Sequence, residues 1–380
     1  MSTDLTGPDI VVVANKPVAA TDDLTLIVDG TEIAGWEDIE VTLRTEGFPP
    51  TFQVTASNGP TDQLPVEAGD PCVVKLGADT VITGYVDRVR DYGDANTHRI
   101  EITGRGKTSD LVDCGAEWPS HQMIGGNALI IAQRLAQYYG INVVLANGAS
   151  PGPDVPSWPL NYGETAADII QRVARNAALL AYEDSLGNLV LANAGSTQAA
   201  SGISWGVNVQ AWSVERSMDQ RYSEYICVGI AADTEGDVQG SDLFSAVFDP
   251  NVPRHRLMYL IEEYGAANPE DFTEKRAKWE MARRAGRSNV VLATVDSWRD
   301  KAGKLWAPNT LMPVWLPAAT TGEKLILSEV TFKRNNETGT TADIVAMPSL
   351  AFTPEPIVLQ PVSAADVKPV NADAGQGGNQ

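Results

Sequence analysis

The strongest constraint on the fold is a hydrophobic alternation with a period of two residues that runs from Leu24 to Val112. Turn residues such as Asp29-Gly30, a dipeptide typical of tight hairpins, interrupt the alternation. A period of two is typical of antiparallel strands, and this block contains no run with helical spacing. The pattern predicts a small barrel or sandwich. The expected strands are 24–28, 31–36, 40–45, 51–56, 72–76, 81–90 and 98–104.

The same alternation returns later in the chain and resembles the end of the first block. The expected strands are 204–214, 224–231, 289–296, 311–316, 325–333 and 340–347. Residues 82–86 align with residues 326–330, and the same offset matches Arg90 with Arg334 and Ile100 with Ile344. Hairpins share composition by default, but the matching order predicts two β modules of common architecture.

Between and within these blocks, three segments have the helical period. Apolar residues recur at helical spacing over 128–139, and Gly140 supplies a C-cap. A second helix is expected after residues 162–164, followed by a hairpin with strands 180–183 and 189–192. A third helix is expected at about 269–287, with acidic residues in its first turns and arginines in its last, an order that complements the helix dipole.

These patterns predict an α+β chain with two similar antiparallel β-barrel domains, an α+β insert between them and an extended C-terminal tail. The expected divisions are an N-terminal extension (1–20), a first barrel (21–113), the insert (114–200), a second barrel that includes the third helix (201–352) and a flexible tail (353–380). The tail is assigned from its prolines, its glycines and its lack of core-forming periodicity.

Charge excludes two classes of partner. The 380 residues contain 49 acidic residues and 28 lysines and arginines, which gives a net charge of −21. Specific nucleic-acid binding and attachment to an anionic membrane both need a basic surface, so neither is expected. No apolar run approaches the ~18 residues that cross a bilayer, and no basic segment marks a secretory leader, so synthesis in the cytoplasm and no membrane insertion are predicted. Cys72, Cys114 and Cys227 are expected to be small buried hydrophobic residues, without a disulfide or zinc site.

The segment 104–108, Gly-Arg-Gly-Lys-Thr, is similar to a phosphate-binding loop. That motif needs a glycine five residues before Gly106, where this chain has Glu101, and a carboxylate there would repel a phosphate. No convincing helix is expected after it. The segment is therefore interpreted as the end of a strand with a solvated Lys107.

The segment 202–206 matches the G-x-S-x-G pattern around Ser204, and His255 lies downstream. A nucleophile elbow must join a strand to a helix, whereas here an alternating strand follows the serine. Metal-ligand spacing is absent among the histidines, and paired acids are expected to be solvated rather than catalytic, so no catalytic, cofactor-binding or metal-binding residue is assigned. The tryptophans near element ends fit core packing and interface anchoring equally. The histidines are His98, His121 and His255, and the acid pairs are Glu183-Asp184 and Glu262-Glu263. The tryptophans are Trp118, Trp158, Trp205, Trp212 and Trp306.

The order of these features resembles the Mu-like phage baseplate hub family. The residues that carry the resemblance to its first barrel are 69–70, 73–76, 82–87, 98–105 and 110–113. Residues 163–191 are similar to the helical insert of that family, and residues 306–309 and 325–332 are similar to its second barrel. The resemblance covers roughly residues 24–352 and rests on the order of the motifs.

The resemblance implies a homotrimeric ring between the tail tube protein and the central membrane-piercing spike protein of a contractile tail, in contact with other baseplate proteins. Two similar barrels per chain would adapt sixfold symmetry to threefold symmetry around a central channel for the genome. The implied location is the virion tail baseplate, with assembly in the host cytoplasm, no enzyme activity and no cofactor. The alternatives are a tail-associated serine hydrolase that uses Ser204 and the hub part of a related secretion-system spike.

Overall fold

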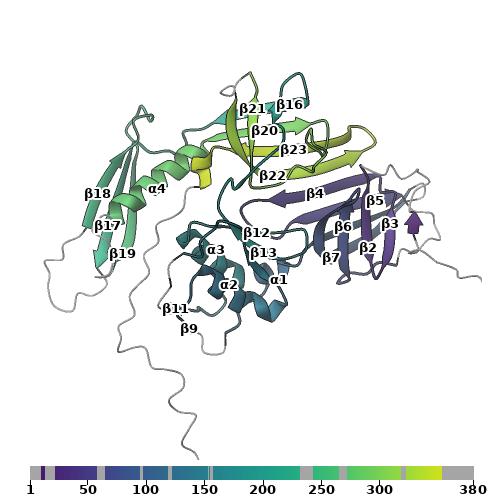
Figure 1. Cartoon of the computed structure of the whole chain (residues 1–380), viewed down its shortest axis with the longest axis horizontal. Coiled ribbons are helices and arrows are strands. Elements are labelled where there is room, and N and C mark those ends of the chain that lie inside the picture. The colour runs from purple at the N-terminus through teal and green to yellow at the C-terminus, as the bar shows by residue number, and fades with distance from the viewer. Residues whose placement is uncertain are drawn as a thin grey trace, which may run out of the picture.

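The computed structural model describes residues 10–12, 22–57, 65–94, 97–118, 122–152, 154, 157–231, 243–264, 272–317 and 322–352. Two β lobes lie side by side, a helical insert lies beneath them, and a small sheet with one long helix lies at one end (Figure 1). The predicted tail at 353–380 lies outside the described residues. So does the predicted N-terminal extension, except for strand β1 (Ile10–Val12), which pairs with β3.

The first lobe consists of the alternating segments that the sequence predicted. In β2 the side chains of Leu24, Leu26 and Val28 are buried and the intervening residues are partly exposed, as a period of two requires. Its strands are β2 (Leu24–Val28), β3 (Thr31–Ala34), β4 (Asp38–Arg44), β5 (Thr51–Ser57), β6 (Pro71–Leu76), β7 (Asp79–Gly93) and β8 (His98–Gly106).

The second lobe repeats the strand order of the first. Its neighbouring strands follow the order β21-β22-β23-β20-β16, and the first lobe has the order β6-β7-β8-β5-β4. The predicted duplication is therefore visible in the topology. The strands are β14 (Thr197–Gln198), β15 (Ile203–Ser204), β16 (Val209–Arg216), β20 (Asn289–Val295), β21 (Thr310–Trp315), β22 (Glu323–Asn335) and β23 (Gly339–Met347).

Both long hairpins contain a β-bulge at a corresponding place. The β7–β8 ladder shifts between Val86 and Arg88, and the β22–β23 ladder shifts between Leu327 and Glu329. Aligning the two bulged positions gives an offset of 328 − 87 = 241, whereas the alignment made from the sequence uses 326 − 82 = 244. That alignment is wrong by three residues, because hairpin composition does not identify register.

The two lobes share one sheet and one core. Strand β4 pairs antiparallel with β22, which joins both lobes in a 15-stranded sheet. Val41 of the first lobe and Phe332 of the second lie opposite each other in this ladder, and both belong to a single buried cluster. Among the described residues, no strand pair closes either lobe into the predicted barrel.

The two helices and the hairpin predicted for the insert form, together with one short helix and three short strands that were not predicted. Asn127 caps α2, Gly140 ends the following 3-10 turn with a φ of 64°, and Thr165 begins α3 with a capping box to Asp168. The unpredicted helix is α1, which directly follows Thr108. The elements are α1 (Ser109–Asp113), β9 (Gln122–Ile124), α2 (Ala128–Ala136), the 3-10 turn Gln137–Tyr139, β10 (Val143–Leu145), β11 (Ser157–Pro159), α3 (Ala166–Asn176), β12 (Leu180–Glu183) and β13 (Leu189–Ala192).

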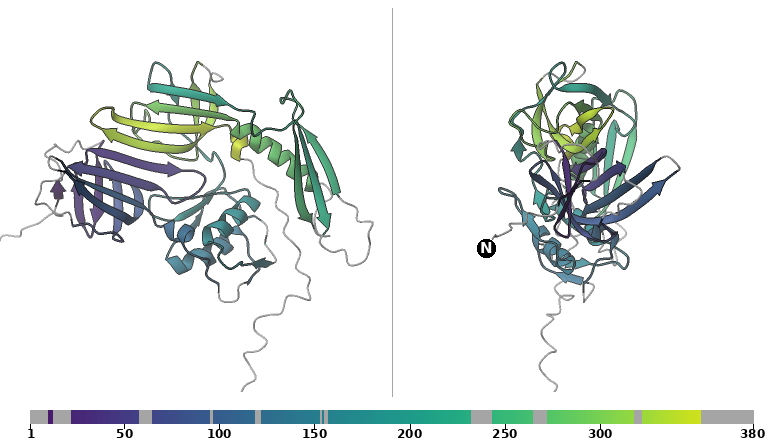
Figure 2. Two further views of the ribbon diagram at one scale, coloured as in Figure 1. Left: turned by 180° about the vertical axis from the view of Figure 1, so that it is seen from behind. Right: turned by 90° about the vertical axis from the view of Figure 1, so that its right-hand side faces the viewer.

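A separate three-stranded sheet interrupts the second lobe in sequence. It consists of β17 (Glu224–Ala231), β18 (Leu243–Phe248) and β19 (Leu257–Tyr264), and α4 (Phe272–Arg287) packs on one face and runs toward the second lobe (Figure 2). Only β17 and α4 were predicted, and β17 was expected to belong to the second barrel. A short turn Ser349–Phe352 packs on α4 at the end of the described chain.

The prediction that the cysteines are buried is confirmed for Cys72 and Cys227 and is wrong for Cys114. Cys114 is exposed because it caps the C-terminal end of α1, where the chain leaves the first lobe. Within the described ranges, no helix combines the length and the apolar character that a membrane crossing requires.

Candidate assembly surfaces

The seam between the two lobes is bonded through its side chains as well as its backbones. The buried hydroxyls of Thr42 and Thr331 lie 3.0 Å apart across the β4–β22 ladder, and Arg44 pairs with Glu329 at 2.8 Å. The hydroxyl of Thr45 donates to the carbonyl of Leu327 at 2.9 Å. Cross-strand pairs of this kind specify the register of the two strands.

Two arginines of the second lobe bind the first lobe at other points. Arg334 donates to the carboxylate of Asp23 at 2.8 Å and to the carbonyl of Asp22 at 2.6 Å, and only 4% of Asp23 is exposed. Arg299 donates to Asp79 at 2.7 Å and to the carbonyl of Leu76 at 3.1 Å. The sheet, the common core and these ion pairs hold the two lobes as one body.

A buried carboxylate attaches the insert to the first lobe. Glu183 on β12 accepts hydrogen bonds from the backbone N–H groups of Lys107 and Thr108, both at 3.0 Å, and from the Thr108 hydroxyl. A Cβ at Gly106 would overlap this carboxylate, so a larger residue there would displace it. Burial raises the pKa of Glu183 to about 7, and the three hydrogen bonds act in the opposite direction. The prediction that Glu183 is solvated is wrong.

The phosphate-loop-like segment 104–108 therefore does bind an anion, and that anion belongs to its own chain. Two successive N–H groups and a hydroxyl converge on one carboxylate, as in backbone anion nests. The prediction that no helix follows is also wrong, because α1 begins at Ser109. Since Glu183 engages these donors, the segment works as a clasp between the first lobe and the insert.

The candidate hydrolase residues do not come together. Ser204 lies in β15, its backbone N–H donates to Asn208 at 2.8 Å, and a turn leads directly to β16 without the helix that a nucleophile elbow needs. His255 lies in the connection between β18 and β19 of the separate sheet. His98 contacts Asp91 at 2.5 Å, and His121 lies outside the described residues. The described ranges contain no group of three or more potential metal ligands.

The tryptophans divide between core and surface. Trp306 is buried and donates to the carbonyl of Ser297 at 3.0 Å. Trp205 is half exposed and lies edge-on to Trp212, with ring centroids 6.2 Å apart. Trp118 lies beneath Arg134. The side chain of Trp158 is outside the described part, as are those of Glu262 and Glu263, which belong to β19 rather than to a loop.

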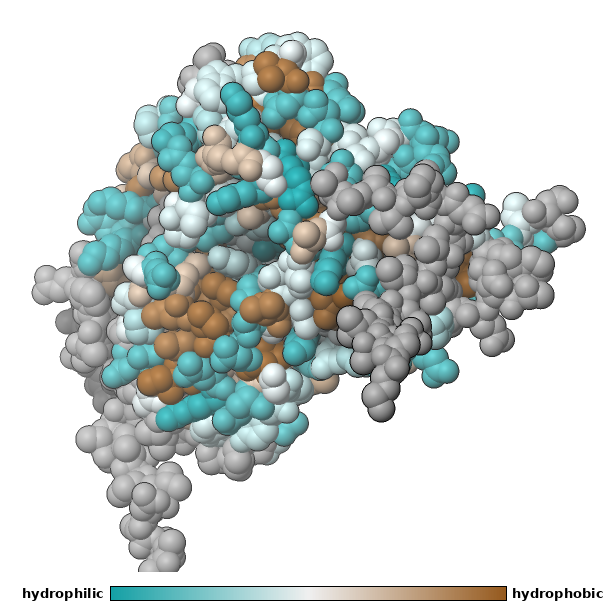
Figure 3. Space-filling view, turned by 45° about the vertical axis from the view of Figure 1, so that its right-hand side comes forward, coloured by the Kyte–Doolittle hydropathy of each residue, from teal (hydrophilic) through white to brown (hydrophobic). Residues whose placement is uncertain are grey.

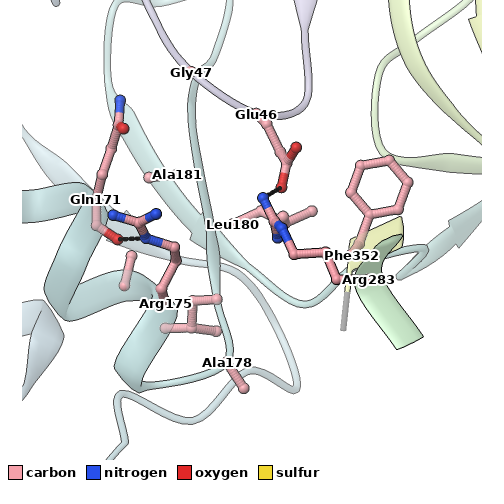
Figure 4. A pocket seen from close by; sticks show the side chains of 11 residues that line it. Glu46, Gly47, Gln171, Arg175, Ala178, Leu180, Ala181, Arg283 and Phe352 are labelled. Carbon is pink, nitrogen blue, oxygen red and sulfur yellow. Dashed lines mark hydrogen bonds and ion pairs between the residues drawn. The ribbon is translucent and has the colours of Figure 1, made fainter. Parts of the chain in front are cut away.

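A cavity of about 220 Å³ lies where the first lobe, the insert and α4 meet (Figure 4). Glu46, in the turn after β4, accepts from Arg283 at 3.4 Å and also pairs with Arg287, both on α4. On the opposite wall Arg175 donates to the carbonyl of Gln171 at 3.2 Å. The pairs that Glu46 makes show how α4 is held against the first lobe.

Among the described residues, one face of the separate sheet is covered by α4 and the other face is exposed. Tyr225 and Cys227 face α4 and are buried. On the other face Phe244, Phe248, Tyr259 and Ile261 are 61–69% exposed. Hydrophobic side chains also gather on the lower part of the face in Figure 3, at the height of the insert in Figure 1, whereas the upper part is mostly polar. The outer face of the separate sheet was not found from the sequence, because β18 and β19 were not predicted.

Three protein-family models match three separate parts of the chain. Residues 23–106 match the N-terminal part of the Mu phage baseplate assembly protein GpP-like family. Residues 108–193 match the second domain of the baseplate hub protein gp44-like family, and residues 270–355 match the fourth domain of the Mu phage baseplate assembly protein GpP. Both long hairpins, Thr108 and Glu183 of the clasp, and the whole of α4 fall within these matches.

Individual relatives agree with the family models. The chain is 29% identical over 339 residues to the baseplate hub protein gp44 of Escherichia phage Mu, covering 87% of this chain and 88% of that one. A 43 kDa tail protein of prophage MuSo2 from Shewanella oneidensis is 28% identical, with a TM-score of 0.78 over 87% of this chain and 99% of that chain. A tail protein from Neisseria meningitidis MC58 shares the fold at 21% identity, with a TM-score of 0.74 over 88% of this chain and 98% of that chain.

Proposed function

The chain belongs to the Mu-like phage baseplate hub family and is a structural protein of the phage tail, and we propose that three copies of it form a ring between the tail tube and the central spike. The observation that carries this proposal is the repeated strand order of the two lobes, β6-β7-β8-β5-β4 and β21-β22-β23-β20-β16. Three chains would present six similar lobes to a sixfold tube and remain threefold toward the spike.

The divisions predicted from the sequence give each part a role in this ring. The parts at 21–113 and 201–352 act as the two barrel-type hub domains and build the rim. The insert at 114–200, clasped by Glu183, lies beneath the rim (Figure 1). The tail at 353–380 serves contacts with the spike or a neighbouring protein. The rigid seam between the lobes supports this role, because a symmetry adaptor must hold its two halves at a constant angle.

The acidic character of the chain suits a channel for the genome. With a net charge of −21, a wall formed by this protein would repel DNA rather than hold it. The proposed role needs no catalytic residue, cofactor or metal. Assembly in the host cytoplasm precedes incorporation into the virion baseplate.

Light scattering coupled to size exclusion tests the oligomeric state. We expect the mass of three chains of 40.6 kDa each, and class averages from electron microscopy should show a ring with a central hole. A monomer at the highest attainable concentration would refute the ring.

A serine-directed covalent probe tests the hydrolase alternative. We expect no labelling of Ser204, so the wild type and Ser204→Ala should show the same lack of reaction with the probe. Labelling that disappears in the variant would favour a hydrolase.

A further inference from the structure

The strand ladders relate the two lobes residue by residue. Starting from the aligned bulges at Asp87 and Ser328, the ladders of β8 and β23 carry the correspondence to β5 and β20. In this correspondence Phe52, Val54 and Ala56 match Val291, Ala293 and Val295, and all six belong to the buried core. Agreement of the inward-facing residues supports the register, because a slip of one residue would place them on the outer face.

The same ladders carry the correspondence to β4 and β16. Ile39 and Val41, which face the core, correspond to Trp212 and Val214, which also pack against it. Strand β16 is therefore the counterpart of β4. The half of β22 beyond its bulge, Glu329 to Arg334, corresponds to the half of β7 from Arg88 to Gly93.

Within one chain, β4 already contacts the other lobe, whereas its counterpart β16 does not. Strand β4 of the first lobe pairs with the outer half of β22, from Glu329 to Arg334. The equivalent contact, β16 of the second lobe against Arg88 to Gly93 of a first lobe, does not occur within one chain, because β16 lies on the side of the second lobe away from the seam (Figure 1).

Both strands of the missing contact have an open edge in the part of the chain that the structure describes. Strand β16 ends the 15-stranded sheet, and its ladder is formed with β20. The ladder of β7 with β6 stops at Tyr85, so the segment from Arg88 to Gly93 is paired with β8 alone. Figure 2 shows this hairpin extending beyond the body of the first lobe. Open edges of this kind are templates for strand addition.

We propose that β16 of one copy pairs antiparallel with the outer half of β7 in the next copy and so repeats the β4–β22 seam between chains. The proposal rests on the trimeric ring described above and specifies its interface. Because the contact is head-to-tail, it can close after three copies and leave neither edge open.

The register of the seam predicts the facing residues. Arg90 lies opposite Glu215, which makes an opposite-charge pair. Trp212 lies opposite Gly93, which has no side chain to obstruct the indole group of Trp212. Both Arg90 and Glu215 are exposed in the single chain. Such a pair favours contact between copies that otherwise repel each other through their net charge of −21. The expected pairs are Arg88 with Ser217, Val89 with Arg216, Arg90 with Glu215, Asp91 with Val214, Tyr92 with Ser213 and Gly93 with Trp212.

Disulfide trapping tests this register in the full chain. Directly opposed residues of antiparallel strands lie within disulfide range, so Arg90→Cys combined with Glu215→Cys should cross-link neighbouring copies on mild oxidation. The background is Cys114→Ser, because Cys114 is the exposed native thiol and Cys72 and Cys227 are buried. We expect covalent dimers and trimers on non-reducing gels. Arg90→Cys with Val214→Cys is the matched control, because its side chains point to opposite faces of the sheet, and it should remain monomeric on the gel.

Charge exchange gives an independent readout that does not depend on oxidation. In light-scattering titrations, Arg90→Glu alone and Glu215→Arg alone should each raise the concentration at which the trimer dissociates at least tenfold. The double exchange should restore the wild-type value. If the wild type is a trimer but the Arg90→Cys/Glu215→Cys variant does not cross-link, this interface is wrong and the ring stands. Equal cross-linking in the Arg90→Cys/Val214→Cys control would have the same meaning. A wild type that is monomeric at all concentrations would overturn both.

Discussion

Replacing Glu183 with alanine should destabilise the protein most in mildly acidic solution. The substitution leaves the N–H groups of Lys107 and Thr108 and the Thr108 hydroxyl without their acceptor. Each unsatisfied buried donor costs about 1–3 kcal/mol, so the loss at pH 5 should be about 3 kcal/mol or more.

The pH dependence of this loss follows from the raised pKa of Glu183. Its value in the folded chain is about 7, compared with 4.5 for an ordinary glutamate, so the folded state binds the proton more tightly than the unfolded chain. The stability that Glu183 contributes is therefore complete below pH 4.5 and declines as the pH rises to about 7. Between pH 5 and pH 8 the decline amounts to about 2.5 kcal/mol, at 1.36 kcal/mol for each pH unit of the difference. The alanine variant lacks this decline, so its deficit should be about 2.5 kcal/mol smaller at pH 8 than at pH 5.

Reversible urea unfolding at several pH values between 5 and 8, followed by circular dichroism, measures this difference. Hydrogen exchange at the amides of Lys107 and Thr108 locates it, because both should exchange faster in the variant. Glu274→Ala is the control, since Glu274 is an exposed glutamate on α4 that pairs with Lys278, and its small deficit should not change with pH. A deficit for Glu183→Ala that is equal at pH 5 and pH 8 would refute the reasoning.

Three further substitutions test other parts of the structure. Arg334→Ala leaves the carboxylate of Asp23 buried and unpaired, so urea unfolding should show a loss of about 3–5 kcal/mol, whereas a loss under 1 kcal/mol would mean that the seam does not depend on this pair. Thr165→Ala removes the capping box of α3 and should cost about 1 kcal/mol, whereas Thr165→Ser should be nearly neutral; equal effects would contradict the cap. Gly106→Ala should displace the clasp carboxylate and cost roughly 1–3 kcal/mol, whereas Gly115→Ala has open space and should not, and equal melting temperatures for the two variants would count against the clasp.

The local elements were predictable because their signals lie within a few consecutive residues. Alternating burial defined β2 and β6, residues 162–164 marked the approach to α3, and Gly140 marked the end of the preceding helical turn. Strands β18 and β19 were missed because the intervening segment is polar and the outer face of this sheet is uncovered, so the contrast between buried and exposed positions is weak.

The alternating sequence by itself determined that this chain forms two β-rich blocks around a helical insert, because hydrophobic periodicity is a local property. Only the tertiary structure decided that β4 pairs with β22, that the hairpins correspond at an offset of 241 (328 − 87), and that Glu183 occupies the nest at Lys107 and Thr108. Those outcomes depend on strand edges and charges far apart in the chain, where many pairings have similar local energies. The selected pairing is the one that buries a common core and satisfies the polar groups at the seam.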